Sequence, residues 1–243
     1  MEKTLVLIHG FLGSSQDFSQ IQKDLSSSHR VIALDLPLDL EHFSLKNISK
    51  SIYQKLTSLH VQKAIFVGYS MGGRIALELY RNHPEMFEKL VLISASPGIR
   101  NEKDRESRLL SDLNWAEVLQ ADVCAFLEKW YAQDLFKSFR EHAGFASHLR
   151  IRKNHVSLKH AQMLVEASPA TNLDHFDLLG QIQIPVLVLL GEYDLKYQNL
   201  WSNLVANLPH IKLKTISHAG HVVHLENSNA TANAINNFIN SAE

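Results

Sequence analysis

Short apolar runs recur along this chain of 243 residues and constrain its fold more than any other feature. Each run is rich in Val, Ile and Leu, which is typical of strands in a parallel sheet covered by helices on both faces. Helical patterns separate the runs, as where Phe18, Ile21 and Leu25 recur on one helix face. This alternation predicts an α/β fold with an open, mainly parallel, doubly wound sheet of about six strands. The predicted strands are Thr4–Ile8, Val31–Leu34, Ala64–Val67, Leu90–Ile93, Val186–Leu190 and, more weakly, Ile211–Ile216.

One long segment interrupts the alternation. From Pro97 to about Ile184 the sequence has helical patterns but no convincing strand. An insertion of this length between two strands is best explained as a helical cap folded over one edge of the sheet. We therefore expect a core formed by residues 1–97 and 185–243, with a cap at 98–184 inserted between its strands. The helical stretches of the cap are Arg105–Leu113, Trp115–Tyr131, Leu135–Phe145 and Leu158–Ala167.

Composition narrows the class of function. Hydrophobic residues make up 45% of the chain and charged residues 20%, as in one ordinary soluble domain. The formal net charge of −1 offers no basic field for a nucleic acid and no polybasic stripe for a membrane, which leaves a small molecule as the expected partner. The first apolar run is too short for a signal peptide or a membrane span, so we expect a cytoplasmic protein. The single cysteine, Cys124, lies in an apolar run and is expected to be a buried, reduced thiol.

A candidate nucleophile lies in the sequence Gly68-Tyr69-Ser70-Met71-Gly72, which has the form G-x-S-x-G. The motif follows a predicted strand and precedes a helical pattern, and this context makes it specific. Glycines permit a sharp strand-to-helix turn that lifts the serine hydroxyl above the sheet. The alternative is a glycine-rich turn that happens to contain a serine. A phosphate-binding loop and a dinucleotide-binding fingerprint are both excluded, because the spacing of neither motif is present.

A nucleophilic serine needs a base, and the base needs a third group to orient it. On a fold of this kind the expected order along the chain is serine, acid, histidine. Asp194 and His221 both follow predicted strands, at the edge where loops converge on a ligand crevice. Asp194 is preferred to Glu192 because it lies further along the loop. The backbone N–H groups of Phe11 and Met71 are the expected oxyanion hole.

The histidines near the C-terminus also suggest a metal site. His218, His221 and His224 are spaced three apart, and Glu226 could serve as a further zinc ligand. Three-residue spacing across a loop does not aim three imidazoles at one point, however, and Ser70 and Asp194 both favour His221 as a base. We therefore expect no metal and no cofactor. His224 is expected to start a helix or to support His221 from behind.

Taken together, these residues resemble the α/β-hydrolase fold superfamily over essentially the whole chain. Within it the chain resembles the 2-succinyl-6-hydroxy-2,4-cyclohexadiene-1-carboxylate synthases, which eliminate pyruvate in menaquinone biosynthesis. One departure is the loop Asp35–Leu40, which lacks the glycine–histidine–glycine that relatives usually carry after D-x-P, so we expect this loop and one wall of the site to be remodelled. The resemblance rests on Gly68–Arg74, Ser96-Pro97-Gly98, Arg105, Arg108, Asp112, Trp115, Phe126, Trp130-Tyr131, Leu135-Phe136, Arg152-Lys153-Asn154, Gly191–Tyr197, Gly220-His221 and His224–Asn227.

The resemblance implies a carbon–oxygen lyase acting on 2-succinyl-5-enolpyruvyl-6-hydroxy-3-cyclohexene-1-carboxylate, a trianion. It assigns carboxylate binding to Arg74, Arg108 and Arg152, because guanidinium groups bind carboxylates through two parallel hydrogen bonds. Tyr69 and Trp130 are expected to form flat walls around the substrate ring, although core packing also explains Trp130. Ser70, deprotonated by His221, is expected to remove a ring proton rather than form an acyl-enzyme. The alternative is a serine hydrolase, such as a carboxylesterase or a C–C bond hydrolase, with the same Ser70, His221 and Asp194.

Overall fold

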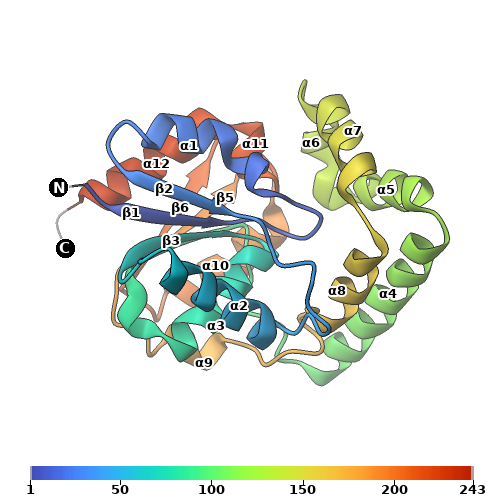
Figure 1. Cartoon of the computed structure of the whole chain (residues 1–243), viewed down its shortest axis with the longest axis horizontal. Coiled ribbons are helices and arrows are strands. Elements are labelled where there is room, and N and C mark those ends of the chain that lie inside the picture. The colour runs from blue at the N-terminus through green and yellow to red at the C-terminus, as the bar shows by residue number, and fades with distance from the viewer. Residues whose placement is uncertain (1, 242–243) are drawn as a thin grey trace.

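A computed structural model describes residues 2–241 and contains a six-stranded parallel sheet (Figure 1). The strand order is β2-β1-β3-β4-β5-β6, and each neighbouring pair is parallel. The sequence therefore predicted the sheet correctly, with small differences at strand ends. The strands are β1 (Thr4–Ile8), β2 (Arg30–Leu34), β3 (Ala64–Tyr69), β4 (Phe87–Ile93), β5 (Val186–Gly191) and β6 (Ile211–Ile216).

Helices cover both faces of this sheet, because alternate strand residues point to opposite sides. Val6 and Phe66 pack into the cluster on one face, whereas Leu5 and Val67 pack into the cluster on the other. The first face is covered by α2 (Leu45–Ser58), α3 (Met71–Asn82), α9 (Phe176–Leu179) and α10 (Leu195–Val205). The second is covered by α1 (Ser19–Leu25) and α12 (Ser228–Asn240).

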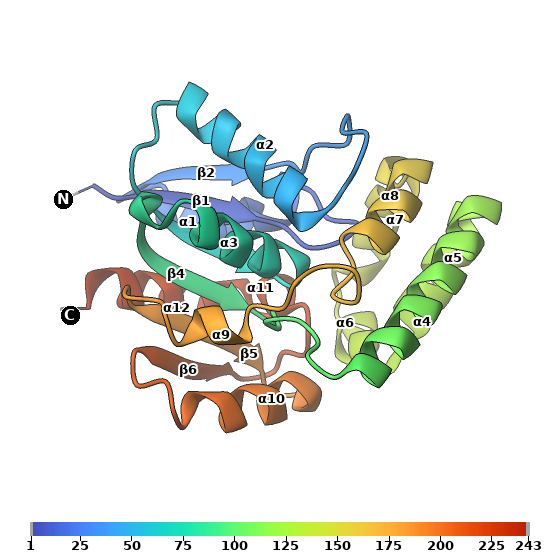
Figure 2. The same ribbon diagram turned by 90° about the horizontal axis from the view of Figure 1, so that it is seen from below.

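Between β4 and β5 the described chain contains helices and loops but no strand. Five of them gather beyond one end of the sheet (Figures 1 and 2). The following α9 returns to the core, where Leu178 and Leu179 pack in the same cluster as β5. The division into a core of 1–97 and 185–243 and a cap of 98–184 stays a prediction; the five helices at the end of the sheet are called the cap below. They are α4 (Glu102–Ala121), α5 (Val123–Ala132), α6 (Lys137–Glu141), α7 (Phe145–His155) and α8 (Leu158–Glu166).

The strand order places a crevice at a defined point of the sheet. Strand β1 lies between β2 and β3, so the connections that follow β1 and β3 run to opposite sides. In open parallel sheets, ligands bind at the carboxyl ends of the strands where this reversal occurs. Phe11 follows β1 and Ser70 follows β3, so both lie at this edge beneath the cap.

Two expectations from the sequence need correction or refinement. Cys124 is exposed rather than buried, because it lies on the outer side of α5 at the second residue of the helix. The unusual loop Asp35–Leu40 does not line the main cavity; Asp35, Leu36 and Leu38 border a separate cavity of about 60 Å³. Beyond this loop, the backbone N–H of Phe43 is bound by Glu166 of α8, which ties the core to the cap.

No helix in residues 2–241 is long and apolar enough to cross a membrane.

Candidate active site

The turn between β3 and α3 holds Ser70 in a strained backbone conformation. Its φ is 50° and its ψ is −111°, outside the regions that a non-glycine residue ordinarily adopts. The turn is sharp because α3 begins directly behind the strand, and a Cβ on Gly72 would overlap the backbone carbonyl of Ile8. The sequence G-x-S-x-G thus permits the close approach that sets the Ser70 side chain above the sheet edge.

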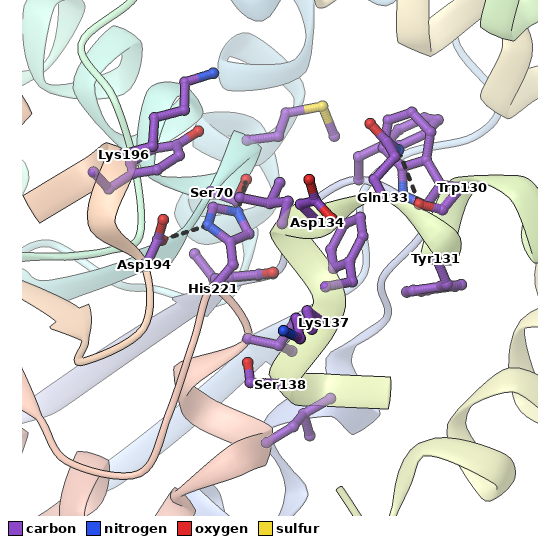
Figure 3. A pocket seen from close by; sticks show the side chains of 18 of the residues that line it. Ser70, Trp130, Tyr131, Gln133, Asp134, Lys137, Ser138, Asp194, Lys196 and His221 are labelled. Atoms are coloured by element: carbon purple, nitrogen blue, oxygen red, sulfur yellow. Dashed lines mark hydrogen bonds and ion pairs between the residues drawn. The ribbon is translucent and has the colours of Figure 1, made fainter. Parts of the chain in front are cut away.

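Three side chains from three separate loops meet at this edge. Nδ1 of His221 donates to Oδ2 of Asp194 over 2.7 Å, and its Nε2 lies 3.4 Å from Oγ of Ser70 (Figure 3). Asp194 and His221 are each 3% exposed, so water does not compete for their hydrogen bond. The second contact is longer than the usual range for a hydrogen bond. The order along the bonds is acid, imidazole, hydroxyl, which is the geometry needed to draw a proton from Ser70.

The structure distinguishes between the two acids of the loop after β5. Asp194 is buried against His221, whereas Glu192 is exposed and accepts a hydrogen bond from the backbone N–H of His218 over 2.9 Å. The acid that contacts His221 is thus Asp194 and not Glu192, in agreement with the preference stated from the sequence. Oδ1 of Asp194 is buried and has no hydrogen-bond partner among the described residues.

The two residues expected to form an oxyanion hole, Phe11 and Met71, border the cavity that Ser70 faces. Met71 is the first residue of α3, and the first N–H groups of a helix have no partner within it. Phe11 lies in the turn after β1, which the N–H of Gly13 closes by bonding to the carbonyl of Gly10. The positive end of the α3 dipole adds to the attraction for a developing negative charge at this point.

A cavity of about 940 Å³ separates the sheet edge from the cap. All ten residues proposed from the sequence line it, so the fold brings them together from segments far apart in the chain. Figure 3 shows Ser70, His221 and Asp194 on the sheet side, with Trp130 and Tyr131 opposite. The ten are Phe11, Tyr69, Ser70, Met71, Arg74, Arg108, Trp130, Arg152, Asp194 and His221.

The three predicted carboxylate-binding arginines differ in their partners. Arg108 donates its Nε to both oxygens of Asp112, at 2.9 and 2.8 Å. Arg152 is fully buried and forms an ion pair with Asp17. Arg74 is also buried, but among residues 2–241 its side chain donates a hydrogen bond only to the carbonyl oxygen of Ala167, at 2.7 Å, and pairs with no acid. Burial, together with the nearby Arg108 charge, lowers the pKa of Arg74 to about 10, so it stays a cation at neutral pH.

The two predicted aromatic walls are both present at the cavity. Tyr69 is 8% exposed, and its ring lies 5.6 Å from the His221 ring, centroid to centroid. Trp130 contacts Phe11 edge-on at 5.4 Å and stacks on Phe126 at 5.4 Å. Trp130 therefore packs against other aromatic rings and also borders the cavity, so both sequence explanations describe part of its surroundings.

Sequence reasoning missed a buried polar group at one end of the cavity. Asp17 and His148 line it beside Arg152, and Nε2 of His148 lies 2.8 Å from the hydroxyl of Tyr131. Burial, with the Arg152 charge, lowers the pKa of His148 to about 4. The position of Asp17 in the loop after β1 was an available signal, because such loops face the crevice. No local signal marked His148, whose surroundings come from other helices.

His224 is the least satisfied polar side chain at this end. It is 1% exposed, and neither ring nitrogen has a hydrogen-bond partner among the described residues. Burial lowers the pKa of His224 to about 3, so the ring is neutral, and it packs 4.2 Å from the Tyr69 ring. Within residues 2–241 no group of acids, histidines and cysteines is arranged to hold a metal ion, and His218 is exposed whereas His224 is buried. Metal independence stays a prediction.

Comparisons with known proteins bear on the family. The model of the α/β hydrolase fold family matches residues 3–228. The 2-succinyl-6-hydroxy-2,4-cyclohexadiene-1-carboxylate synthase of Serratia proteamaculans is 30% identical over 97% of this chain and 92% of its own length. The chain belongs to this synthase family of α/β hydrolases. It is accordingly an enzyme.

A solved structure agrees with this membership. MenH from S. aureus superposes with a TM-score of 0.90 at 30% identity, covering 98% of this chain and 93% of that one. The chain also matches the chloroplastic protein PHYLLO of Arabidopsis thaliana at 27% identity, but it spans only 15% of that protein's length. The Serratia synthase and the MenH structure thus match 97% and 98% of this chain, cap included.

Proposed function

We propose that this chain is a carbon–oxygen lyase that eliminates pyruvate from 2-succinyl-5-enolpyruvyl-6-hydroxy-3-cyclohexene-1-carboxylate in menaquinone biosynthesis. The product is 2-succinyl-6-hydroxy-2,4-cyclohexadiene-1-carboxylate. Membership of the synthase family supports this activity. The observation that carries the proposal is Arg74, a buried cation without a carboxylate partner in the same cavity as Ser70. Such a site favours an anionic substrate, because an ion pair with a carboxylate would offset the burial of the Arg74 charge and its repulsion from Arg108.

In the proposed mechanism Ser70 acts as a base rather than as a nucleophile. His221, oriented by Asp194, takes the hydroxyl proton of Ser70, and the alkoxide then removes a proton from the substrate ring. The electron pair left on the ring is delocalised into the succinyl carbonyl, whose oxygen accepts hydrogen bonds from the N–H groups of Phe11 and Met71. The bond between the ring and the enolpyruvyl oxygen then breaks. The proton held by His221 is available to the departing enolate, which leaves as pyruvate.

The three arginines have different tasks in this proposal. Arg74 binds one substrate carboxylate outright. Arg108 and Arg152 already contact Asp112 and Asp17, and they bind a carboxylate through the N–H groups that those acids leave free. Nε and Nη1 of Arg152 are buried and have no hydrogen-bond partner among the described residues, so its guanidinium group keeps N–H donors for a further acceptor. The neutral His148 and His224 add no positive charge of their own.

A serine hydrolase remains the second candidate, because the same three side chains and two N–H groups can also transfer an acyl group. One pair of assays separates the two. Pyruvate release from the trianionic substrate is followed by coupling to lactate dehydrogenase, and hydrolysis of a neutral p-nitrophenyl ester is followed by its absorbance. We expect rapid pyruvate release and slow ester cleavage. Rapid ester cleavage without pyruvate release contradicts the proposal and favours the hydrolase.

The expected setting of the enzyme is part of the proposal. A polycarboxylate of low molecular weight is the expected binding partner, because the cap covers the cavity and the buried Arg74 in its lining has no acid partner among the described residues. A cytoplasmic location and the absence of nucleic-acid partners stay predictions from composition and charge.

A further inference from the structure

The loop that carries His221 has no regular secondary structure of its own. It runs from Ser217 to Val222, between β6 and the short helix α11 (Val223–Glu226). His218 in this loop has a φ of 55°, in the left-handed region. A loop of this kind has no ladder or helix bonds to hold it, so other groups must set the direction of the His221 side chain.

The carboxylate of Glu226 accepts hydrogen bonds from the loop on both sides of His221. Oε2 of Glu226 accepts a hydrogen bond from the backbone N–H of Gly220 over 3.0 Å. Oε1 of the same side chain accepts one from the backbone N–H of Val222, also over 3.0 Å. Both bonds have a charged acceptor and are therefore stronger than bonds between neutral groups. Together they hold the Ala219–Gly220 peptide, one residue before His221, and the His221–Val222 peptide directly after it, so they restrict the directions in which the Cα–Cβ bond of His221 can point.

The cap contacts the same loop from the other side. A Cβ on Gly220 would overlap the hydroxyl of Ser138 on α6, so the cap packs directly on the backbone at this glycine. The ring of Phe136 lies 6.2 Å from the His221 ring, centroid to centroid. The loop therefore lies between Glu226 and the cap, and a loss of either contact gives the imidazole room to move.

We propose that Glu226 is a positioning residue for His221, acting through these two backbone hydrogen bonds. The inference rests on the proposed role of His221 as the base for Ser70. Its physical reason is the length of the contact between Nε2 of His221 and Oγ of Ser70, which is already 3.4 Å. A further displacement by a fraction of an ångström removes the hydrogen bond needed for proton transfer, and misplacement of about 1 Å costs on the order of 100-fold in rate.

A matched control is available in the same loop. Oε2 of Glu192 accepts a hydrogen bond from the backbone N–H of His218 over 2.9 Å. This bond also holds the loop by a carboxylate, but it acts three residues before His221 and on one side only. Loss of Glu192 therefore tests loop anchoring in general, whereas loss of Glu226 tests the hydrogen bonds to the N–H groups of Gly220 and Val222, the residues on either side of His221.

The experiment measures activation of Ser70 by two independent readouts. The first is the rate at which a fluorophosphonate labels Ser70 irreversibly, which depends on His221 but not on recognition of the proposed substrate. The second is kcat and KM for pyruvate release. The variants are Glu226→Ala, Glu226→Gln and Glu192→Gln, with Ser70→Ala as the unlabelled blank, and circular dichroism checks that each is folded.

We expect Glu226→Ala to lower both the labelling rate and kcat about 10- to 100-fold, with KM nearly unchanged. Glu226→Gln should recover part of the loss, because its amide oxygen can still accept one of the two N–H groups, and this variant carries the test if the alanine variant does not fold. The labelling rate and kcat of Glu192→Gln should stay within about twofold of the wild-type values. Glu192 is exposed, so replacing its carboxylate with a neutral amide costs little.

Two results overturn the inference. One is labelling of both Glu226 variants at the wild-type rate, and the other is an equal loss in Glu192→Gln. Absence of labelling in the wild type overturns the role of His221 and the inference with it. Slow labelling of the Glu226 variants without pyruvate release by the wild type supports the inference and contradicts only the proposed substrate.

Discussion

The sheet edge and the cap enclose one cavity but hold their polar side chains by different means. At the sheet edge, Ser70, Asp194 and His221 follow the ends of β3, β5 and β6, and backbone geometry sets their positions. In the cap, Arg108 and Arg152 are held by ion pairs of their side chains with Asp112 and Asp17. Arg74, on α3 of the core, is the one of the three arginines left without an acid among the described residues.

In the proposed function, this difference assigns reactivity to the sheet edge and substrate selectivity to the cap and Arg74. The sheet edge supplies a hydroxyl, an imidazole and two N–H groups, which are suited to many reactions of the fold. In the proposed function, the cap and Arg74 select the molecule that reaches these groups, through charge and shape. Substitutions at the edge should therefore abolish turnover of every substrate, whereas substitutions of the arginines should affect anionic substrates alone.

Ser70→Ala or His221→Ala should have the largest effect. Each is expected to lower kcat for pyruvate release on the order of 10³-fold or more, because neither group can move the proton without the other. The double variant should be little worse than either single variant, and the melting temperature should stay close to that of the wild type. Additive losses, or a collapsed melt for Ser70→Ala, would argue against a single relay.

Arg74→Ala should give the next largest effect. A lost charge-assisted contact costs about 1.5–3 kcal/mol, which lowers kcat/KM for the trianion about 10- to 100-fold. Arg74→Lys should recover only part, since an ammonium keeps the charge without the planar fork. Cleavage of a neutral aryl ester should be nearly unchanged. Arg100→Ala is the control, because Arg100 is 58% exposed and lies outside the residues that line the cavity.

Arg108→Ala and Arg152→Ala should also weaken use of the trianion, but for mixed reasons. Loss of Arg152 leaves Asp17 buried without its cation, so this variant should lose stability as well as substrate binding. Thermal melts measured beside kcat/KM separate the two effects. Wild-type turnover of the trianion by all three alanine variants would contradict carboxylate binding and favour the hydrolase.

The smallest effect concerns pH and the buried histidines. Burial lowers the pKa of His148 to about 4 and that of His224 to about 3, against about 6.5 in an unfolded chain. Between these values the unfolded state binds more protons, so stability should fall as pH decreases below about 6.5, by up to about 1.4 kcal/mol per pH unit for each histidine.

Urea unfolding at a series of pH values checks this prediction. His148→Gln should have a shallower slope below pH 6.5 than the wild type, whereas His42→Gln should not, because the His42 side chain is 73% exposed. Equal slopes for the wild type and His148→Gln would show that His148 contributes nothing to the acid sensitivity.

The chemistry-bearing residues of the sheet edge were predictable because their signals are local. Ser70 is marked by glycines two residues on either side and by a strand before it, and Asp194 and His221 by their places just beyond apolar runs. The partners of the cap residues were not predictable. Asp17 and Arg152 are separated by 135 positions, and the polarity of Asp17 alone suggests a solvated loop. Cys124 was misjudged for the same reason, since an apolar neighbourhood in sequence does not tell which side of a helix faces water.

The sequence by itself determined the order of strands and helices, the strained turn at Ser70 and the type of each reactive side chain. These follow from periodicity and from steric limits that act within a few residues. Only the tertiary structure decided that Arg74 lacks an acid among the described residues, that Arg152 has one, and that Glu226 binds the N–H groups of Gly220 and Val222. Charge pairing depends on distances between segments that the chain order leaves open, and packing of the cap on the sheet sets those distances.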